Sequence, residues 1–380
     1  MAPHGPAALP LLSCGKGIAP LKFFTTMADS IPSRSSHGRG GATSPGARAS
    51  GEGLPAVLIE AFSDRPGAGN GAAVVLLEGP NLPGLSGDGW MRLIAGSLRQ
   101  SETAFLVPHG EEWLLRWFTP TREVPLCGHA TLASLLALRH WQRLEAGACT
   151  RFHTRSGPLE VRLDAEREGM GHLQLPSGGL QEALPPASLR SLLVSKLGCG
   201  VERFWRSGLG YGVALLPQTA PLASLEPIAA LLEGDLRLGL VLMQSLGSMG
   251  DGTESPRVGG VSADYQLRFF APGLGIEEDP VTGSAHALVA PYWMERLGRS
   301  SVVGWQCSDR PGGMGCEAGS SGMIRVSGTG SLLWDGTLKA RPQLCVEGSH
   351  SGGDRPTDGP EAWWALAPKP SWRDSAATPS

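Results

Sequence analysis

The sequence predicts a protein that combines strands and helices in two similar units. The chain has 380 residues, which is too long for one ordinary domain core and suits two. Its central part contains one pattern twice: RWFTPTREVPLCGHATLASLLAL begins at Arg116, and RFFAPGLGIEEDPVTGSAHALVA begins at Arg268. Each copy reads as a strand, a Pro-containing loop and a helix. We therefore expect a tandem duplication.

The two copies match at constant offsets. WLLRWFT and YQLRFFA alternate with the period of a strand, whereas HATLASLLALRHW and SAHALVAPYWMERL are long apolar segments typical of helices. Short coincidences occur between such units, but the shared order of Arg, two aromatic residues and Pro, then Pro, Gly and Ala, favours duplication. Residues 116–120 match 268–272 at an offset of 152, and after three inserted residues Pro125, Gly128 and Ala130 match Pro280, Gly283 and Ala285 at an offset of 155.

The two ends differ from this core. Residues 1–54 are rich in Ser, Lys and Arg and contain only Asp29 and Glu52 as acids. Organelle transit peptides have such a composition, and a disordered extension explains it equally well. Residues 347–380 are rich in Gly, Pro and Ser and lack a hydrophobic period, which predicts a disordered tail. The expected units between these ends are residues 55–170 and residues 171–346.

Composition excludes several classes of protein. The formal net charge is -3, and no cluster of Lys and Arg interleaved with aromatic residues occurs, so we expect no nucleic-acid binding. No apolar run approaches the roughly 18 residues of a membrane span. The seven cysteines are scattered without CxxC or zinc-type spacing, which indicates a reducing compartment and no structural metal. We expect a cytoplasmic protein, or a plastid or mitochondrial one if residues 1–54 are a transit peptide.

Each copy places a glycine where its helix begins, at Gly128 and Gly283. The first N–H groups of a helix are unpaired and carry partial positive charge, so such a start can receive a carboxylate. Clefts between domains are preferred ligand sites. We therefore expect the two repeats to supply two halves of one pocket.

Four stretches occur in a recognisable order along the chain, and a fifth, CSDRPGGMG (307–315), fits the same family pattern less closely. They are AFSDRPGAGNGAAVV (61–75), SETAFL (101–106), EVPLCGHATLA (123–133) and EDPVTGSAHA (278–287). Together they resemble the phenazine-biosynthesis isomerase (PhzF-like) family, which is related in fold to diaminopimelate epimerase. The resemblance implies an α+β fold of two pseudo-symmetric domains, each a curved, mostly antiparallel sheet wrapped around a central helix. It also implies a cofactor-free acid/base catalyst acting on a small carboxylic acid, and a possible homodimer.

By this resemblance Glu102 is the principal acid/base, assisted by His129 and Asp279, with Ser284 nearby. A carboxyl group with a raised pKa, or an imidazole, can take and return a proton near neutral pH. We expect desolvation to raise the pKa of Glu102, and the proximity of Asp279 to raise the pKa of one of the two further. His129 stands in the first helical turn, where the helix dipole disfavours imidazolium, so we expect a neutral ring.

The remaining candidates would bind the substrate. Thr282 and Ser284 offer hydroxyl groups, Gly128 and Gly283 lie at helix starts with free N–H groups, and Asn70 offers an amide. Taken singly, residues of these types more often cap helices or form turns. The order of the four stretches favours the functional interpretation, with no metal ligand and no cofactor.

Cys127 requires a separate interpretation. Related amino acid epimerases use two thiols, one from each domain, but the second copy has Thr282 at the matching position. One thiol cannot serve both faces of a substrate, so we expect Cys127 to be a small buried residue of the pocket wall. Glycines at 67 and 71 also replace the bulkier residues of the family pattern Arg-Pro-Phe-x-Gly-Asn-Pro, which leaves substrate identity open.

Two other functions compete with isomerisation. GAGNGA (67–72) fits a dinucleotide-binding pattern after a strand, with Asp88 downstream, but too few residues follow for the required crossover helix. The alternative is a protein of the same fold that binds a metabolite or a protein without turnover, because a fold does not identify a substrate. The set of three titratable candidates favours catalysis.

Overall fold

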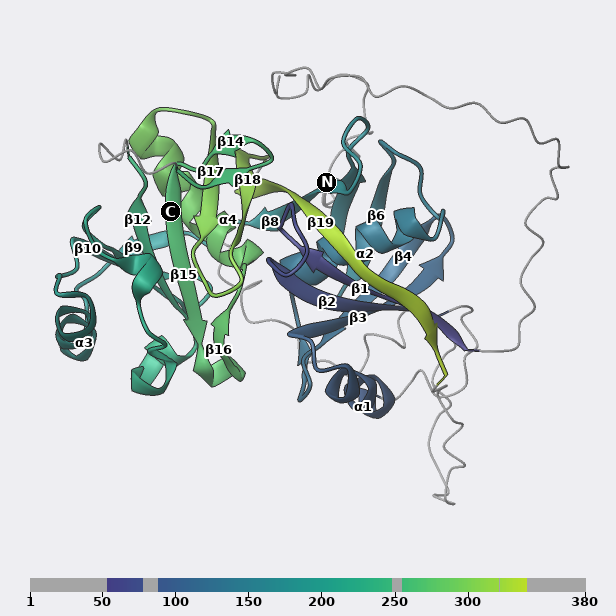
Figure 1. Ribbon diagram of the computed structural model, residues 1–380, viewed down its shortest axis with the longest axis horizontal. Helices are drawn as coiled ribbons and strands as arrows, with labels where there is room; N and C mark the ends of the chain where they lie inside the picture. Colours follow the sequence, from purple (N-terminus) through teal and green to yellow (C-terminus); the bar gives the residue numbers. More distant parts are fainter. Residues whose placement is uncertain (1–52, 78–87, 248–254, 321, 340–380) are drawn as a thin grey trace, which may run out of the picture. The chain divides into compact units, whose positions relative to one another are not determined.

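The computed structural model describes residues 53–77, 88–247, 255–320 and 322–339 (Figure 1). The expectations for a transit peptide and for a disordered tail at 347–380 lie outside the described residues. The described part combines helices with a large mixed sheet. This bears out the α+β class expected from the sequence.

In the first half, eight strands close around α2 (Gly128–His140). Residues 128–138 of this helix are all buried, and a helix that is apolar on every side belongs inside a protein. Neighbouring strands of this sheet run antiparallel, except that β2 is parallel to β3 and β4 is parallel to β6. The short strand β5 (Glu123–Val124) pairs with β4. In order of pairing the strands are β1 (Leu54–Ala61), β2 (Asn70–Leu76), β3 (Glu102–His109), β4 (Glu112–Phe118), β6 (Cys149–Thr154), β7 (Gly157–Leu163), β8 (Met170–Pro176) and β19 (Met323–Leu338), which pairs with β1 again.

In the second half, a comparable sheet curves around α4 (Gly283–Leu297). The helix packs against β8, β17, β18 and β19. The two parallel pairs are β11–β12 and β15–β17. The short β16 (Ile276–Asp279) adds to β15, and β13 (Arg257–Val258) pairs with β14 (Val261–Ser262). The other strands are β9 (Leu180–Glu182), β10 (Arg203–Ser207), β11 (Gly212–Leu215), β12 (Leu240–Ser245), β15 (Tyr265–Ala271), β17 (Ser301–Gln306) and β18 (Gly312–Ala318).

The two halves share β8 and β19. The first part of β19 pairs with β8 and β18, and its second part pairs with β1. Figure 1 shows β19 running from beside β18 to beside β1. Apolar residues around α2 and α4 accordingly form one continuous core. The division into units 55–170 and 171–346 stays a prediction.

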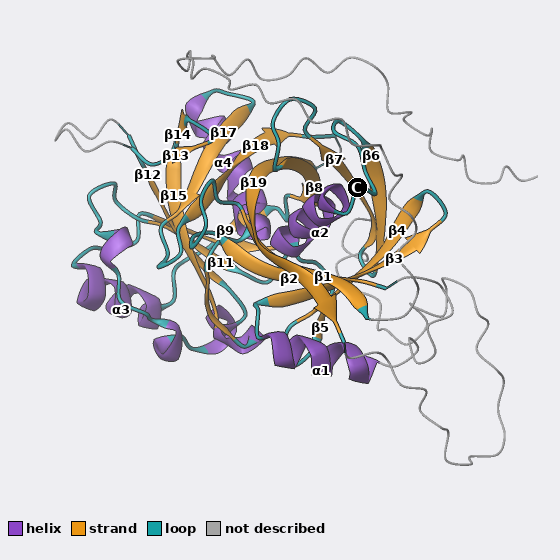
Figure 2. Ribbon diagram, turned by 45° about the vertical axis from the view of Figure 1, so that its right-hand side comes forward, coloured by secondary structure: helices purple, strands orange, loops and turns teal. Residues whose placement is uncertain are grey.

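Two further helices lie outside the curved sheets (Figure 2). α1 (Asp88–Leu98) buries Met91 and Ile94 against a cluster that includes Phe105. α3 (Ala187–Leu197) buries leucines at 189, 193 and 197, four residues apart, as an amphipathic helix does. Short 3-10 turns occur at η1 (Leu222–Ser224), η2 (Ala229–Leu231), η3 (Gly234–Arg237) and η4 (Pro272–Leu274).

The elements predicted from the duplicated pattern are confirmed. WLLRWFT and YQLRFFA form β4 and β15, and the two apolar segments form α2 and α4. The glycine-rich GAGNGA leads into strand β2 instead of a crossover helix. This confirms that the stretch lacks the geometry of a dinucleotide site.

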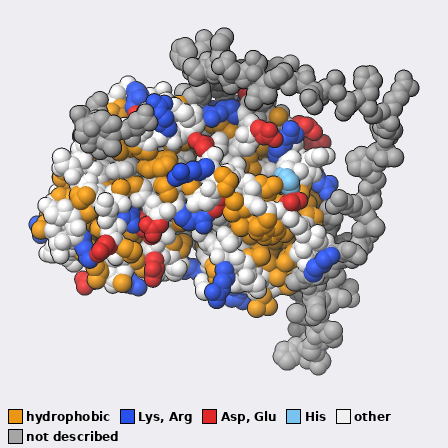
Figure 3. Space-filling view, in the orientation of Figure 1, with side chains coloured by type: hydrophobic (Ala, Val, Ile, Leu, Met, Phe, Trp, Pro, Cys, Tyr) orange, Lys and Arg blue, Asp and Glu red, His pale blue; other side chains and the backbone are white. Residues whose placement is uncertain are grey.

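The surface carries charges of both signs, interspersed on the face that Figure 3 shows. On the same face, hydrophobic side chains gather over β19 (Figure 3), where Leu332, Leu333 and Trp334 are each about two-fifths exposed. Every described helix is too short or too polar to cross a bilayer. The homodimer stays a prediction.

Candidate active site

Asn70 and Glu102 begin two neighbouring strands. β2 and β3 are parallel, with Ala72 opposite Glu102, so both strands start at the same edge of the sheet. The hydroxyl of Ser101 donates to Asn70 Oδ1 at 3.0 Å. This hydrogen bond fixes the orientation of the amide and directs its Nδ2 toward the candidate site.

The amide of Asn70 joins residues from both repeats. Its Nδ2 donates to Asp279 Oδ1 at 2.6 Å and to the carbonyl of Val281 at 3.1 Å. It also lies 3.1 Å from His129 Nδ1. Asn70 is completely buried, so these contacts form without competition from water. The predicted residues Asn70, His129 and Asp279 therefore come together.

Glu102 and Cys127 approach the ring of His129 from other directions. Glu102 Oε2 lies 3.2 Å from Nε2, and Cys127 Sγ lies 3.5 Å from Nδ1. The ring therefore places Nδ1 beside the amide of Asn70 and the thiol of Cys127, and Nε2 beside the carboxyl group of Glu102. The three side chains are 4–7% exposed, and the thiol is buried as the sequence predicted. One proton can therefore be shared between an acid and an imidazole in a poorly solvated site.

The electrostatics of the cluster make Asp279 a weaker acid than an ordinary aspartate. Burial, opposed by the charge of His129 and reinforced by Glu102, raises the pKa of Asp279 to about 6. Hydrogen bonds from Thr282 and Asn70 act in the opposite direction. This bears out the expectation that one of the two neighbouring carboxyl groups has a raised pKa.

The expectation of a weakly basic His129 is wrong. Burial lowers its pKa, but the hydrogen bond and charge of Glu102, together with the charge of Asp279, raise it above the ordinary value. The carboxylates therefore outweigh both the helix dipole and desolvation. Burial and the charge of Glu102 also raise the pKa of the Cys127 thiol, which makes it a poor nucleophile.

Thr282 is held by protein groups. Its hydroxyl donates to Asp279 Oδ2 at 2.6 Å, and its N–H donates to Gln306 Oε1 at 2.8 Å. Gln306 Nε2 donates in turn to the carbonyl of Asp279 at 2.5 Å. Here Thr282 orients Asp279, and a direct role in substrate binding stays a prediction. Sequence reasoning missed Gln306, although it directly precedes the CSDRPGGMG stretch.

The two helix starts meet at their glycines. A Cβ at Gly128 would lie 3.4 Å from the Cα of Gly283, so the two repeats contact each other at this point. Within the described residues, neither α2 nor α4 has a side chain that caps its first N–H groups. Two uncapped helix starts beside the titratable cluster form a suitable receptor for a carboxylate.

Ser284 and Tyr211 form the half-buried rim of the cluster. Burial raises the pKa of Tyr211, a hydrogen bond with Ser284 lowers it, and the charges of Asp279 and Glu102 raise it further. The tyrosine hydroxyl therefore lies close to the candidate residues. Sequence reasoning missed Tyr211, because it lies in a loop outside the four stretches.

An arginine–glutamate pair anchors the loop of each repeat. Arg116 Nε and Nη2 donate to Glu123 at 2.8 and 2.7 Å. Arg268 Nε and Nη2 donate to Glu278 at 2.6 and 2.5 Å. Both glutamates lie on the short strands β5 and β16, which lead directly into the glycine starts of the helices. Each bidentate arginine–glutamate pair therefore fixes the loop that carries the reactive residues.

The first stretch is anchored to the last one. Glu60 is buried, accepts from the N–H of Gly67 at 2.6 Å and forms an ion pair with Arg310. The N–H of Gly69 donates to the carbonyl of Pro311 at 3.1 Å, and Gly69 has a φ of 76°, which favours glycine. These contacts bring AFSDRPGAGNG beside CSDRPGGMG and hold Asn70 in place.

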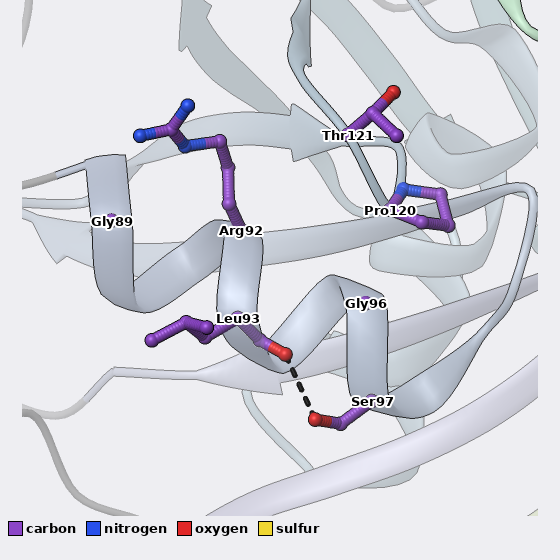
Figure 4. Close-up of a pocket in the computed structure, with 7 residues that line it drawn as sticks. All are labelled: Gly89, Arg92, Leu93, Gly96, Ser97, Pro120 and Thr121. Atoms are coloured by element: carbon purple, nitrogen blue, oxygen red, sulfur yellow. Dashed lines mark hydrogen bonds between the residues drawn. The ribbon is translucent and has the colours of Figure 1, made fainter.

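One described group of side chains could hold a metal ion. Ligand atoms of Glu102, Cys127 and His129 all lie within 4.8 Å of one another. The expectation of no metal ligand rested on sequence spacing, which does not reveal this group. By contrast, a shallow groove beside α1 offers Arg92 as its only charged side chain and lies apart from the cluster (Figure 4).

Known proteins match this chain over most of its described length. The family model described as phenazine biosynthesis-like protein matches residues 59–336. An uncharacterized isomerase of Pseudomonas aeruginosa is 35% identical over 283 residues, covering 74% of this chain and 97% of the relative. A phenazine biosynthesis-like domain-containing protein of Bos taurus is 34% identical, with 76% and 99% covered. A PhzF family structure from Enterococcus faecalis has a TM-score of 0.63 at 31% identity, with 75% and 99% covered. The chain therefore belongs to the phenazine biosynthesis-like (PhzF) family.

Proposed function

We propose that this protein is an isomerase that moves a proton on a small carboxylic acid by acid/base catalysis, without a cofactor. The observation that carries the proposal is the meeting of Glu102, His129 and Asp279: the buried amide of Asn70 contacts both His129 and Asp279, and Glu102 contacts the other side of the His129 ring. His129 and Asp279 come from the two repeats, Glu102 comes from the start of β3, and the cluster lies beside two uncapped helix starts. Relatives named isomerases support this assignment.

The helix starts would hold the substrate. Backbone N–H groups at Gly128 and Gly283 would bind the carboxylate through partial positive charge. The hydroxyl of Ser284 would add a hydrogen bond from the rim. This places the carbons of the acid next to Glu102 rather than in open solvent.

Glu102 would take a proton from one carbon and return it to another. The electron pair of the broken C–H bond enters the adjacent unsaturated system, and a new C–H bond forms at its far end. His129 shares the proton with Glu102 across the 3.2 Å contact, and Asp279, whose pKa lies near 6, can supply or accept a proton near neutral pH. General acid/base catalysis of this kind contributes roughly 10²- to 10⁴-fold in rate.

Deuterium incorporation tests the proposal directly. Small cyclic and amino-acid-derived carboxylic acids are incubated with the full chain in D₂O, and deuterium at carbon is detected by NMR and mass spectrometry. We expect exchange in at least one acid and its loss in Glu102→Gln. Glu111→Gln, which removes the same charge from an exposed position, should retain exchange.

Two results would contradict this assignment. Exchange that persists in a folded Glu102→Gln protein would remove Glu102 from the mechanism. Calorimetric binding of an acid without exchange in the unmodified protein would favour the non-catalytic metabolite-binding alternative.

A further inference from the structure

We propose that Glu102, Cys127 and His129 form a binding site for Zn²⁺, and that the bound ion blocks proton transfer. The metal site stands on the geometry of the three side chains alone. Its regulatory consequence rests on the proposed function.

The three ligand atoms lie within 4.8 Å of one another. Zinc bonds of about 2.3 Å to sulfur and about 2.0–2.2 Å to nitrogen and oxygen place the ligands of a tetrahedral ion roughly 3.3–3.6 Å apart. His129 Nε2 lies 3.2 Å from Glu102 Oε2, and Cys127 Sγ lies 3.5 and 3.9 Å from the two ring nitrogens. One ion can bind only one of the two ring nitrogens, so the thiol and the carboxyl group would have to shift toward a common ion at Nε2.

The ligand set selects the type of metal. A thiolate and an imidazole suit zinc and cobalt, whereas magnesium and calcium prefer oxygen ligands alone. Three protein ligands leave one position of a tetrahedral ion for water. The site is therefore suited to a reversibly bound ion rather than to a closed structural zinc.

The surroundings favour a cation. Glu102 Oε2 is buried and lies 3.2 Å from His129 Nε2, so a cation bound between these two atoms would replace their direct contact. Asp279 lies on the other side of Asn70 and adds a second carboxyl group to the cluster. The three ligands are only 4–7% exposed, so a bound ion would be largely shielded from solvent.

Occupation of the site would remove the groups that the proposed reaction needs. The ion takes the lone pairs of Glu102 and of a ring nitrogen of His129, and the Cys127 thiol releases its proton to solvent as the sulfur–metal bond forms. Glu102 can then no longer accept a proton from carbon. Zinc would act as an inhibitor that competes with catalysis.

Cobalt spectroscopy tests the metal site without a substrate. The full chain is titrated with Co²⁺, and the near-ultraviolet band of thiolate-to-cobalt charge transfer is recorded, followed by displacement with Zn²⁺. Cys127→Thr installs the residue that the second repeat has at 282 and removes the thiol. Cys149→Thr removes an exposed thiol and serves as the matched control.

We expect the band in the unmodified protein and in Cys149→Thr, and its loss in Cys127→Thr, with zinc affinity lowered by about 100-fold or more. A band that is absent from the unmodified protein, or that persists in folded Cys127→Thr, would overturn the metal site. Where deuterium exchange occurs, Zn²⁺ should suppress it in the unmodified protein at concentrations that lower the exchange of Cys127→Thr far less, each protein being compared with its own rate without zinc. Exchange that continues with the site saturated by Zn²⁺ would overturn the inhibition, and the metal site would stand.

Discussion

The two repeats share the ion pairs that position their loops but differ in the titratable residues that those loops carry. Arg116 with Glu123 and Arg268 with Glu278 form matching forks, and each guanidinium lies over a phenylalanine ring, at 5.1 and 5.3 Å. Both loops then end at a glycine helix start. The conserved part is thus the part that positions a helix start.

The differences lie within a few residues of those glycines. The first repeat has Cys127 and His129 where the second has Thr282 and Ser284. The second has Asp279 where the first has Val124. The two repeats thus have similar strand, loop and helix arrangements, but the first carries the imidazole and the second carries the buried acid. The comparison predicts that the two halves contribute unequally to catalysis.

The largest expected effect on exchange distinguishes His129 from Ser284, which occupy matching positions of the two repeats. His129→Ser should lower the maximal rate of deuterium exchange by roughly 10²- to 10⁴-fold, because it removes a partner in proton transfer. Ser284→Ala should raise KM by about tenfold with little effect on kcat, because it removes a hydrogen bond to the substrate. Steady-state kinetics separate kcat from KM. Equal losses of kcat in the two variants would contradict the assignment of proton transfer to His129 and of substrate binding to Ser284.

The next effect concerns the two ion pairs. Arg268→Met should lower the free energy of unfolding by about 3 kcal/mol, because it leaves the half-buried carboxylate of Glu278 without its charged partner. Arg116→Met should cost less, because Arg155 still donates to Glu123 at 2.6 Å. Urea unfolding measures both values.

A double variant is the control for this comparison. Arg268→Met combined with Glu278→Leu removes both charges, so most of the lost stability should return. If the double variant is as unstable as Arg268→Met alone, the unpaired carboxylate is not the cause.

A smaller effect distinguishes the interiors of the two helices. His286 is fully buried beside the hydroxyl of Tyr265 at 2.9 Å, and burial lowers its pKa to about 3; the matching residue in α2 is Thr131. The unfolded chain binds a proton at His286 below about pH 6.5 and the folded chain does not, so stability present above that pH is lost as the pH falls. The loss from this residue should reach about 2 kcal/mol at about pH 5.

His286→Asn should reduce this dependence on pH. Urea unfolding from about pH 7.5 to about pH 5 measures the free energy of both proteins. Parallel curves for the two proteins would show that His286 does not account for the loss.

The sequence predicted the strands and helices of the two repeats for a physical reason. Strand and helix periods are local signals, and the duplicated pattern located both helix starts. The meeting of Glu102, His129 and Asp279 followed from family resemblance, because no local pattern reveals contacts over such separations. The raised pKa of His129 was missed because it depends on two carboxylates from distant segments.

The anchoring contacts were not predictable from spacing alone. Gln306 contacts Asp279 and Thr282 only after β17 is placed beside β15. Arg310 reaches Glu60 across 250 positions of sequence. By contrast, the sequence does show that Glu123 and Glu278 match at the offset of 155 and that each copy begins with an arginine.

The most direct test is a crystal structure of the Glu102→Gln protein with an acid that the unmodified protein exchanges. We expect a carboxylate about 3 Å from backbone nitrogens at the starts of α2 or α4, with the side chain at 102 facing the exchanging carbon. An acid bound elsewhere, such as in the groove beside α1, or a side chain at 102 directed away from the acid, would show that Glu102 and the helix starts do not form the active site.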